Sequence, residues 1–110
     1  MKEFILFVQG SATEPYKVTF RKKDNNLSAY CSCPAGVNGQ YCKHRFNILG
    51  GLSDGIVSGN GDDIAIVASW LPATDVENAM NDVMDAEEQF ENAKLKLSTA
   101  KKLLAKAFRD

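Results

Sequence analysis

The stretch CSCPAGVNGQYCKH, residues 31–44, decides the fold of this chain. It holds all three cysteines and the single histidine of the 110 residues, in the spacing Cys-x-Cys, eight residues, then Cys-x-His. Structural zinc sites take four tetrahedral ligands, and three thiolates with one imidazole are a common set. Pro34, Gly36 and Gly39 allow the chain to reverse, so that the second pair of ligands can meet the first. The predicted zinc ligands are Cys31, Cys33, Cys42 and His44.

Other uses of these side chains fit the sequence less well. A disulfide framework would leave one cysteine over, and clustered thiols in a reducing compartment are better explained by metal. An iron–sulfur cluster is disfavoured because one ligand is a histidine. A catalytic thiol would need a general base, and the sequence indicates none besides that histidine. Four protein ligands would also leave a catalytic zinc no open position for water. We therefore expect one structural zinc and no enzymatic activity.

A small antiparallel sheet and a short helix are predicted on either side of this stretch, which is itself expected to be a loop. Residues 3–9 are branched and aromatic and predict a first strand. Residues 16–22 alternate between apolar and polar side chains, which predicts a second, half-buried strand. A turn cluster follows, and residues 27–31 predict the third strand. Residues 44–49 precede two glycines and predict a short helix with a glycine C-cap, so that the last two ligands lie at a helix start.

The motif and its flanks resemble the SWIM zinc finger. The family pattern is C-x-C-x(n)-C-x-H, which residues 31–44 match at each ligand, and a looser resemblance extends over residues 16–49. The resemblance implies a strand unit and a helix held by zinc, with roles in DNA binding and protein–protein contact. We expect a small stand-alone form of bacterial type, because no helicase-like, transposase or kinase-associated companion domain is recognisable. The long C-terminal helix described below lies outside the family pattern.

Residues 62–71 are ambiguous between a strand and a helix. Their β-branched residues favour a strand, but apolar residues at i, i+3, i+4 and i+7 favour a helix, which we predict. Asp62 and Asp63 are expected to cap its N-terminus, and Pro72 is expected to end it.

One unbroken helix is predicted for residues 75–109, because Thr74 and Glu77 form a capping box and no glycine or proline follows before Arg109. Large apolar residues recur every seven positions, with alanine three positions after each, a heptad pattern typical of a coiled coil. The expected dimer interface comprises Val76, Ala79, Val83, Ala86, Phe90, Ala93, Leu97, Ala100 and Leu104.

Charge indicates the orientation of that coiled coil. Residues 74–91 hold seven acids and no base, whereas residues 92–109 hold six bases and no acid. A parallel pair would place like charges together, and an antiparallel pair centred near Phe90 would place opposite charges together. We therefore predict an antiparallel homodimer. Pairing within the chain, against the helix at residues 62–71, is the competing arrangement.

These elements together predict an α+β fold, with a small antiparallel sheet, a zinc knuckle and a short helix, then a second helix and the coiled-coil helix. The expected divisions are a zinc-binding unit at residues 1–51, a loop and short helix at 52–73, and the long amphipathic helix at 74–110.

Charge also separates the two halves of the chain. Residues 1–50 carry seven Lys or Arg and three Asp or Glu, a net charge of +4, whereas residues 51–110 carry −5. A basic module indicates nucleic acid as a partner, with Tyr16, Tyr30 or Tyr41 able to stack on bases. The acidic half of the long helix weakens that expectation, because phosphate neutralisation supplies most nonspecific affinity. The candidate nucleic-acid-binding residues are Arg21, Lys22, Lys23, Lys43 and Arg45.

The second interpretation is an interaction adaptor, a dimeric rod that displays two zinc modules to a protein partner. Phe20, Phe46 or Trp70 would then be anchors, although each also suits a hydrophobic core. Composition is that of an ordinary soluble protein, with 45% hydrophobic and 25% charged residues. No apolar run approaches the roughly 20 residues of a membrane span, and the N-terminal apolar run is too short for a signal peptide. We expect a cytoplasmic protein with no membrane partner.

Overall fold

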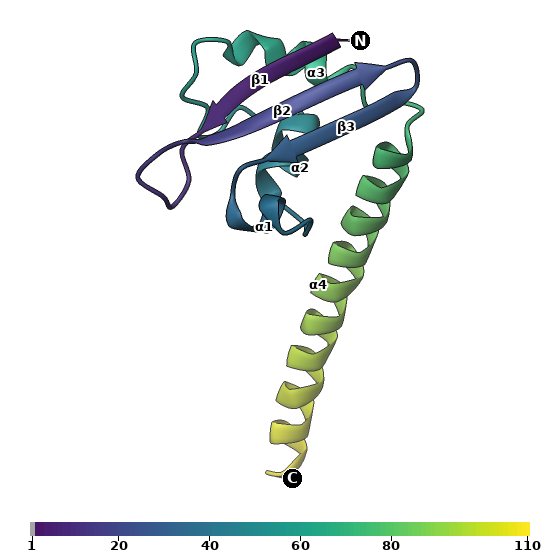
Figure 1. Cartoon of the computed structure of the whole chain (residues 1–110). Coiled ribbons are helices and arrows are strands. Elements are labelled where there is room, and N and C mark those ends of the chain that lie inside the picture. Colours follow the sequence, from purple (N-terminus) through teal and green to yellow (C-terminus); the bar gives the residue numbers. More distant parts are fainter. Residues whose placement is uncertain (1) are drawn as a thin grey trace. The chain divides into compact units, whose positions relative to one another are not determined.

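The computed structural model describes residues 2–110, which form two compact units, one ending at Glu77 and the other comprising Asn78–Asp110. Figure 1 shows the order of the elements along the chain. The elements are β1 (Lys2–Val8), β2 (Tyr16–Lys23), β3 (Asn26–Cys31), α1 (Pro34–Val37), α2 (Lys43–Leu49), the 3₁₀ turn η1 (Gly61–Asp63), α3 (Ile64–Ala68) and α4 (Asp75–Ala107). The predicted α+β class is confirmed.

The sheet is antiparallel in the order β1-β2-β3, and each of the three predicted strands is present. Alternation in β2 places Val18 and Phe20 on one face, where both are fully buried. The strand runs one residue further than predicted, to Lys23, which pairs with Asn26. The tight turn between them is possible because Asp24 adopts a positive φ of 54°, a conformation that Asp tolerates better than most residues.

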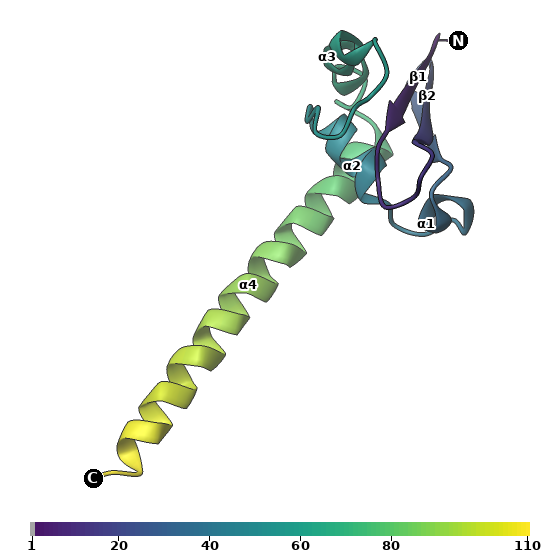
Figure 2. The ribbon, with the colours of Figure 1, turned by 90° about the vertical axis from the view of Figure 1, so that its left-hand side faces the viewer.

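Helices α2 and α3 cover one face of the sheet, called the inner face here (Figure 2). The sheet contributes Leu6, Val18 and Phe20 to the core, and the helices contribute buried branched residues. These helical core residues are Ile48, Leu49, Ile64 and Val67. Burial of this apolar surface is the main force that joins sheet and helices. The opposite face of the sheet, called the outer face, has no helix over it in Figure 2.

The predicted helix at residues 62–71 forms, but it is shorter and begins differently. The 3₁₀ turn η1 leads into α3, which ends at Ala68. The prediction that Asp62 and Asp63 cap this helix is wrong. Asp63 already has helical φ and ψ, its side chain makes no capping hydrogen bond, and its N–H donates to the Asn60 carbonyl at 2.9 Å. The helix therefore continues a 3₁₀ turn and does not start at a side-chain cap.

Helix α4 is unbroken over its 33 residues, as predicted, which corresponds to a length of about 50 Å. Half of the expected capping box forms, because Thr74 Oγ1 accepts a hydrogen bond from the Glu77 N–H at 3.2 Å. The Glu77 carboxylate accepts from the Ala73 N–H at 3.1 Å instead of from Thr74. The Thr74 N–H is engaged elsewhere, since it donates to the Leu71 carbonyl at 3.3 Å.

Among the helices formed by residues 2–110, none combines the length and apolar character that a membrane crossing requires.

Candidate metal centre

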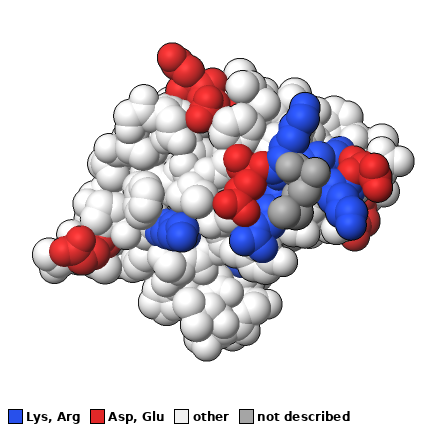
Figure 3. Space-filling model, turned by 45° about the horizontal axis from the view of Figure 1, so that its top comes forward, with Lys and Arg blue, Asp and Glu red and all other residues white. Residues whose placement is uncertain are grey.

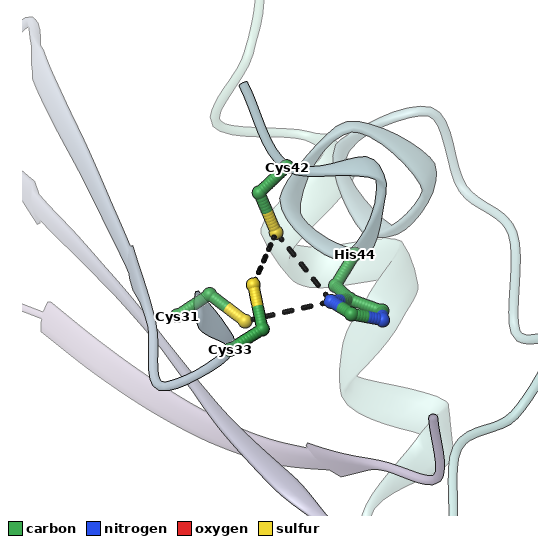
Figure 4. A group of neighbouring side chains, drawn as sticks. All are labelled: Cys31, Cys33, Cys42 and His44. Carbon is green, nitrogen blue, oxygen red and sulfur yellow. Dashed lines mark hydrogen bonds between the residues drawn. The ribbon is translucent and has the colours of Figure 1, made fainter. Parts of the chain in front are cut away.

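The four predicted ligands lie together at one end of the sheet (Figure 4). Each offers one ligand atom, and these atoms lie within 4.8 Å of one another. Cys33 Sγ is 3.4 Å from Cys42 Sγ, and His44 Nδ1 is 3.6 Å from Cys31 Sγ and 3.5 Å from Cys42 Sγ. In a tetrahedral zinc site the usual bond lengths separate two sulfurs by about 3.8 Å, and a sulfur and a nitrogen by about 3.6 Å. The cluster is therefore positioned to bind one zinc ion.

The ligands come from three elements that the short segment between them brings together. Cys31 ends β3, Cys33 is the N-cap of α1, and Cys42 is the N-cap of α2, with His44 in its first turn. A zinc ion bound here would join the sheet to α2 directly. The three cysteines are buried and make no disulfide.

Helix α1 was expected to be a loop, and the structure corrects that expectation. Proline at the first helical position suits a helix start, because its missing N–H needs no partner there. Cys33 Sγ accepts a hydrogen bond from the Gly36 N–H at 3.3 Å, so a zinc ligand also serves as the helix cap. Four residues are too few to give a periodic pattern, and for this reason the sequence did not reveal this helix.

Gly36 is required for a reason that the turn prediction did not include. A Cβ atom at this position would lie 2.3 Å from the Cys31 carbonyl oxygen and 2.9 Å from Cys31 Cβ. The backbone of α1 therefore packs directly on the residue that supplies the first ligand. Gly39 serves the chain reversal itself, because it has a positive φ of 71°.

The surroundings of the cluster raise the pKa of one cysteine and lower the pKa of another. Burial raises the pKa of the Cys31 thiol to about 12, so this group binds zinc only by giving up a firmly held proton. Burial acts to raise the pKa of Cys42 as well, but the nearby backbone N–H groups of Arg45 and His44 and the other two thiols outweigh it, and the pKa is lowered. These N–H groups belong to the start of α2, the end of a helix that favours negative charge.

His44 presents Nδ1 to the thiols, which leaves Nε2 to carry the proton when zinc is bound. Burial, together with the charge of Lys43, lowers the pKa of His44 and keeps the imidazole in the neutral, metal-binding form at neutral pH. The Tyr16 ring packs on the imidazole with ring centroids 5.2 Å apart. Tyr16 is therefore half-buried beside the metal centre rather than presented for base stacking.

The five candidate nucleic-acid-binding residues lie in different places. Arg21 is exposed on the outer face, where Glu3 accepts from its Nε at 2.6 Å. The Lys22 Nζ donates to the Trp70 carbonyl at 3.3 Å, on the opposite side of the strand.

The remaining three candidates lie at the end of β2 or on α2. Arg45 donates to the Ala29 carbonyl at 3.3 Å and to the Gln40 carbonyl at 2.6 Å, so it fixes backbone around the zinc loop. Within residues 2–110, Lys23 and Lys43 form no ion pair, and both are exposed.

Comparison with known proteins identifies this part of the chain. Residues 16–45 match the family model described as SWIM zinc finger, and the four clustered side chains fit the C-x-C-x(n)-C-x-H motif of that family. The resemblance noted from the sequence is confirmed. The match covers β2, β3 and α1 and reaches into α2, whereas β1, α3 and α4 lie outside it. Neither a curated protein nor a solved structure matches the chain.

The contact between Gly36 and Cys31 predicts that Gly36→Ala weakens zinc binding. The added methyl must displace the Cys31 backbone, and such overpacking costs about 1–3 kcal/mol, equivalent to a roughly 5- to 150-fold loss of affinity. Competition against a chromophoric zinc chelator measures the change. Gly59→Ala is the matched control, because a Cβ there meets open space and no positive φ is involved. Equal zinc affinity for the Gly36 variant and the control would contradict the assigned role.

Proposed function

We propose that the protein is a zinc-ordered SWIM module that binds nucleic acid and that α4 joins two copies of it. The zinc is structural, because four protein ligands leave it no position for a water molecule or substrate. The protein is accordingly a binding protein and not an enzyme. A cytoplasmic location agrees with this role, since a reducing compartment keeps the three cysteines available as thiolates.

The observation that carries the nucleic-acid proposal is the segregation of charge. Residues 1–50 have a net charge of +4 in a chain whose total is −1. Figure 3 shows Lys and Arg side chains gathered in one region of the surface, with acidic side chains beside them. A surface that carries both signs of charge supports nucleic-acid binding through a few phosphate contacts rather than through a uniform basic patch. Salt weakens binding of this kind.

The dimer proposal rests on the side chains of α4. Phe90, Leu97 and Leu104 are each more than half exposed, and all three belong to the heptad positions predicted from the sequence. An isolated amphipathic helix of this kind is stabilised mainly by covering its apolar stripe. An antiparallel second copy would cover the stripe and bring the acidic half of one α4 to the basic half of the other.

The alternative is an adaptor that binds only proteins. Two of its three expected anchors are core residues, since Phe20 is fully buried and Trp70 is 8% exposed. Phe46 is half-buried and packs against Tyr41, with ring centroids 5.9 Å apart. The adaptor proposal therefore depends on surfaces other than those anchors.

The nucleic-acid proposal is tested by fluorescence anisotropy of the zinc-loaded protein with labelled single-stranded and duplex DNA and RNA. We expect micromolar or tighter dissociation constants that rise with salt, because counterions are released from the phosphates. Lys23→Ala should weaken binding and reduce the salt slope by about one ion, whereas Lys101→Ala on α4 should do neither. An absence of binding at low salt, with zinc content verified, would refute the proposal and leave the adaptor.

The dimer proposal is tested by multi-angle light scattering across protein concentrations. Wild-type protein should give twice the chain mass of 12.1 kDa. Ala93→Glu should shift the equilibrium to monomer, because it places a charge in the stripe where two helices would meet closely. Ala105→Glu makes the same change outside the stripe and should leave the mass unchanged. A wild-type monomer at tens of micromolar would contradict the proposal.

A further inference from the structure

The outer face of the sheet presents an ordered surface that the metal centre and the core do not use. Strand alternation places Glu3, Ile5 and Phe7 of β1 on it, and the pairing register sets them opposite residues of β2. The resulting rows across the strands are Glu3–Arg21–Ser28, Ile5–Thr19–Tyr30 and Phe7–Lys17. Two aromatic rings and two cations therefore occupy fixed places on one flat surface.

A segment distant in sequence widens this surface. The Val57 N–H donates to the Phe7 carbonyl at 2.9 Å, and Val8 pairs with Ile56 in an antiparallel bridge. This pairing sets Val57 opposite Phe7, on the outer face by the same alternation. Phe7 and Val57 are 39% and 54% exposed, so their apolar surface faces solvent.

The two aromatic rings suit bases of a single strand. Tyr30 lies two strands away from Phe7 and two positions along the sheet, a separation of about 12 Å between backbones. Tyr30 is 56% exposed, and the Arg21 guanidinium lies 5.6 Å from its ring centre, which orients the ring. Flat sheet faces with exposed aromatic side chains bind unpaired bases by stacking, and each stack is tolerant of sequence.

The charges on the outer face favour a polyanion as its ligand, rather than a protein surface with few acidic groups. Lys17, Arg21 and Lys23 are exposed there, and Glu3 is the single acid among the outward positions of the three strands. Glu3 is neutralised by Arg21. Lys17 lies on one side of the Ile5–Thr19–Tyr30 row and Arg21 and Lys23 lie on the other, as phosphates on either side of stacked bases require.

We propose that the outer face is a binding platform for single-stranded nucleic acid, on which Phe7 and Tyr30 stack bases and Lys17 and Lys23 contact phosphates. The proposal rests on the proposed nucleic-acid function and assigns its surface and ligand. A single strand is favoured because duplex bases are not free to stack on a flat face. Stacking on Phe7 and Tyr30 uses base faces that DNA and RNA share, so the ligand is a single strand of either kind.

The test compares matched variants in anisotropy titrations of the zinc-loaded full chain with labelled dT and mixed-sequence oligonucleotides. Tyr30→Leu keeps an apolar side chain but removes the ring, and its matched control is Phe108→Leu, because Phe108 is 77% exposed and lies outside the platform. Lys17→Ala is matched by Lys101→Ala on α4. Circular dichroism and zinc content establish that each variant is folded, and Tyr30→Phe should bind like wild type.

The expected result is a loss of affinity of at least about fivefold for Tyr30→Leu and again for Phe7→Leu, because each removes one stacked base. Lys17→Ala should lower the salt slope by about 0.7, the value for one phosphate of a single strand. The two controls should change neither quantity.

Any of four outcomes would overturn the proposal. Duplex binding that the platform variants do not alter, or equal losses in variants and controls, would remove this surface while the proposed nucleic-acid function stands. Duplex binding as tight as single-strand binding would remove the assignment to a single strand. No binding of any nucleic acid by the wild-type protein would remove the proposed function and this platform together.

Discussion

The convergence of three thiols and one imidazole on a single point is the constraint on which the first unit depends. Cys31 and Cys33 lie at the end of the sheet, and Cys42 and His44 lie at the start of α2. Between them the backbone turns so tightly that Gly36 touches the Cys31 backbone. Without a metal, burial opposes ionisation of Cys31, and side chains chosen for zinc make poor core residues. Zinc turns this unfavourable cluster into a cross-link between sheet and helix.

The two faces of the sheet that carries this cross-link have different roles. The inner face supplies Leu6, Val18 and Phe20 to a small core, and units of this size bury barely enough apolar surface for independent stability. The outer face is left to solvent, although it presents Phe7 and Tyr30. Exposed aromatic side chains lower the solubility of a protein. The fixed spacing of these two rings and the cations beside them favour a ligand that covers them.

The features predictable from the sequence were those that depend on local spacing. The ligand set followed from the interval between cysteines, and the sheet followed from alternation in residues 16–22. The unbroken α4 followed from the absence of glycine and proline. The features that could not be predicted depend on tertiary placement. Arg45 binds two backbone carbonyls and Lys22 binds a third, so these cations hold the fold together, which no charge count reveals. The alternation of residues 16–22 predicted the polar, outward side chains of the second strand, among them Lys17. The aromatic side chains beside them lie on other strands, so their placement could not be predicted without the pairing register.

The dependence of the first unit on zinc is tested by an amide NMR spectrum of the protein before and after zinc is removed by a chelator. We expect one zinc per chain, loss of dispersed signals from β2, β3 and α2 on its removal, and their return when one equivalent of zinc is added. A spectrum that keeps its dispersion with zinc verifiably absent would refute that dependence, because the sheet and α2 would then hold together without the cross-link.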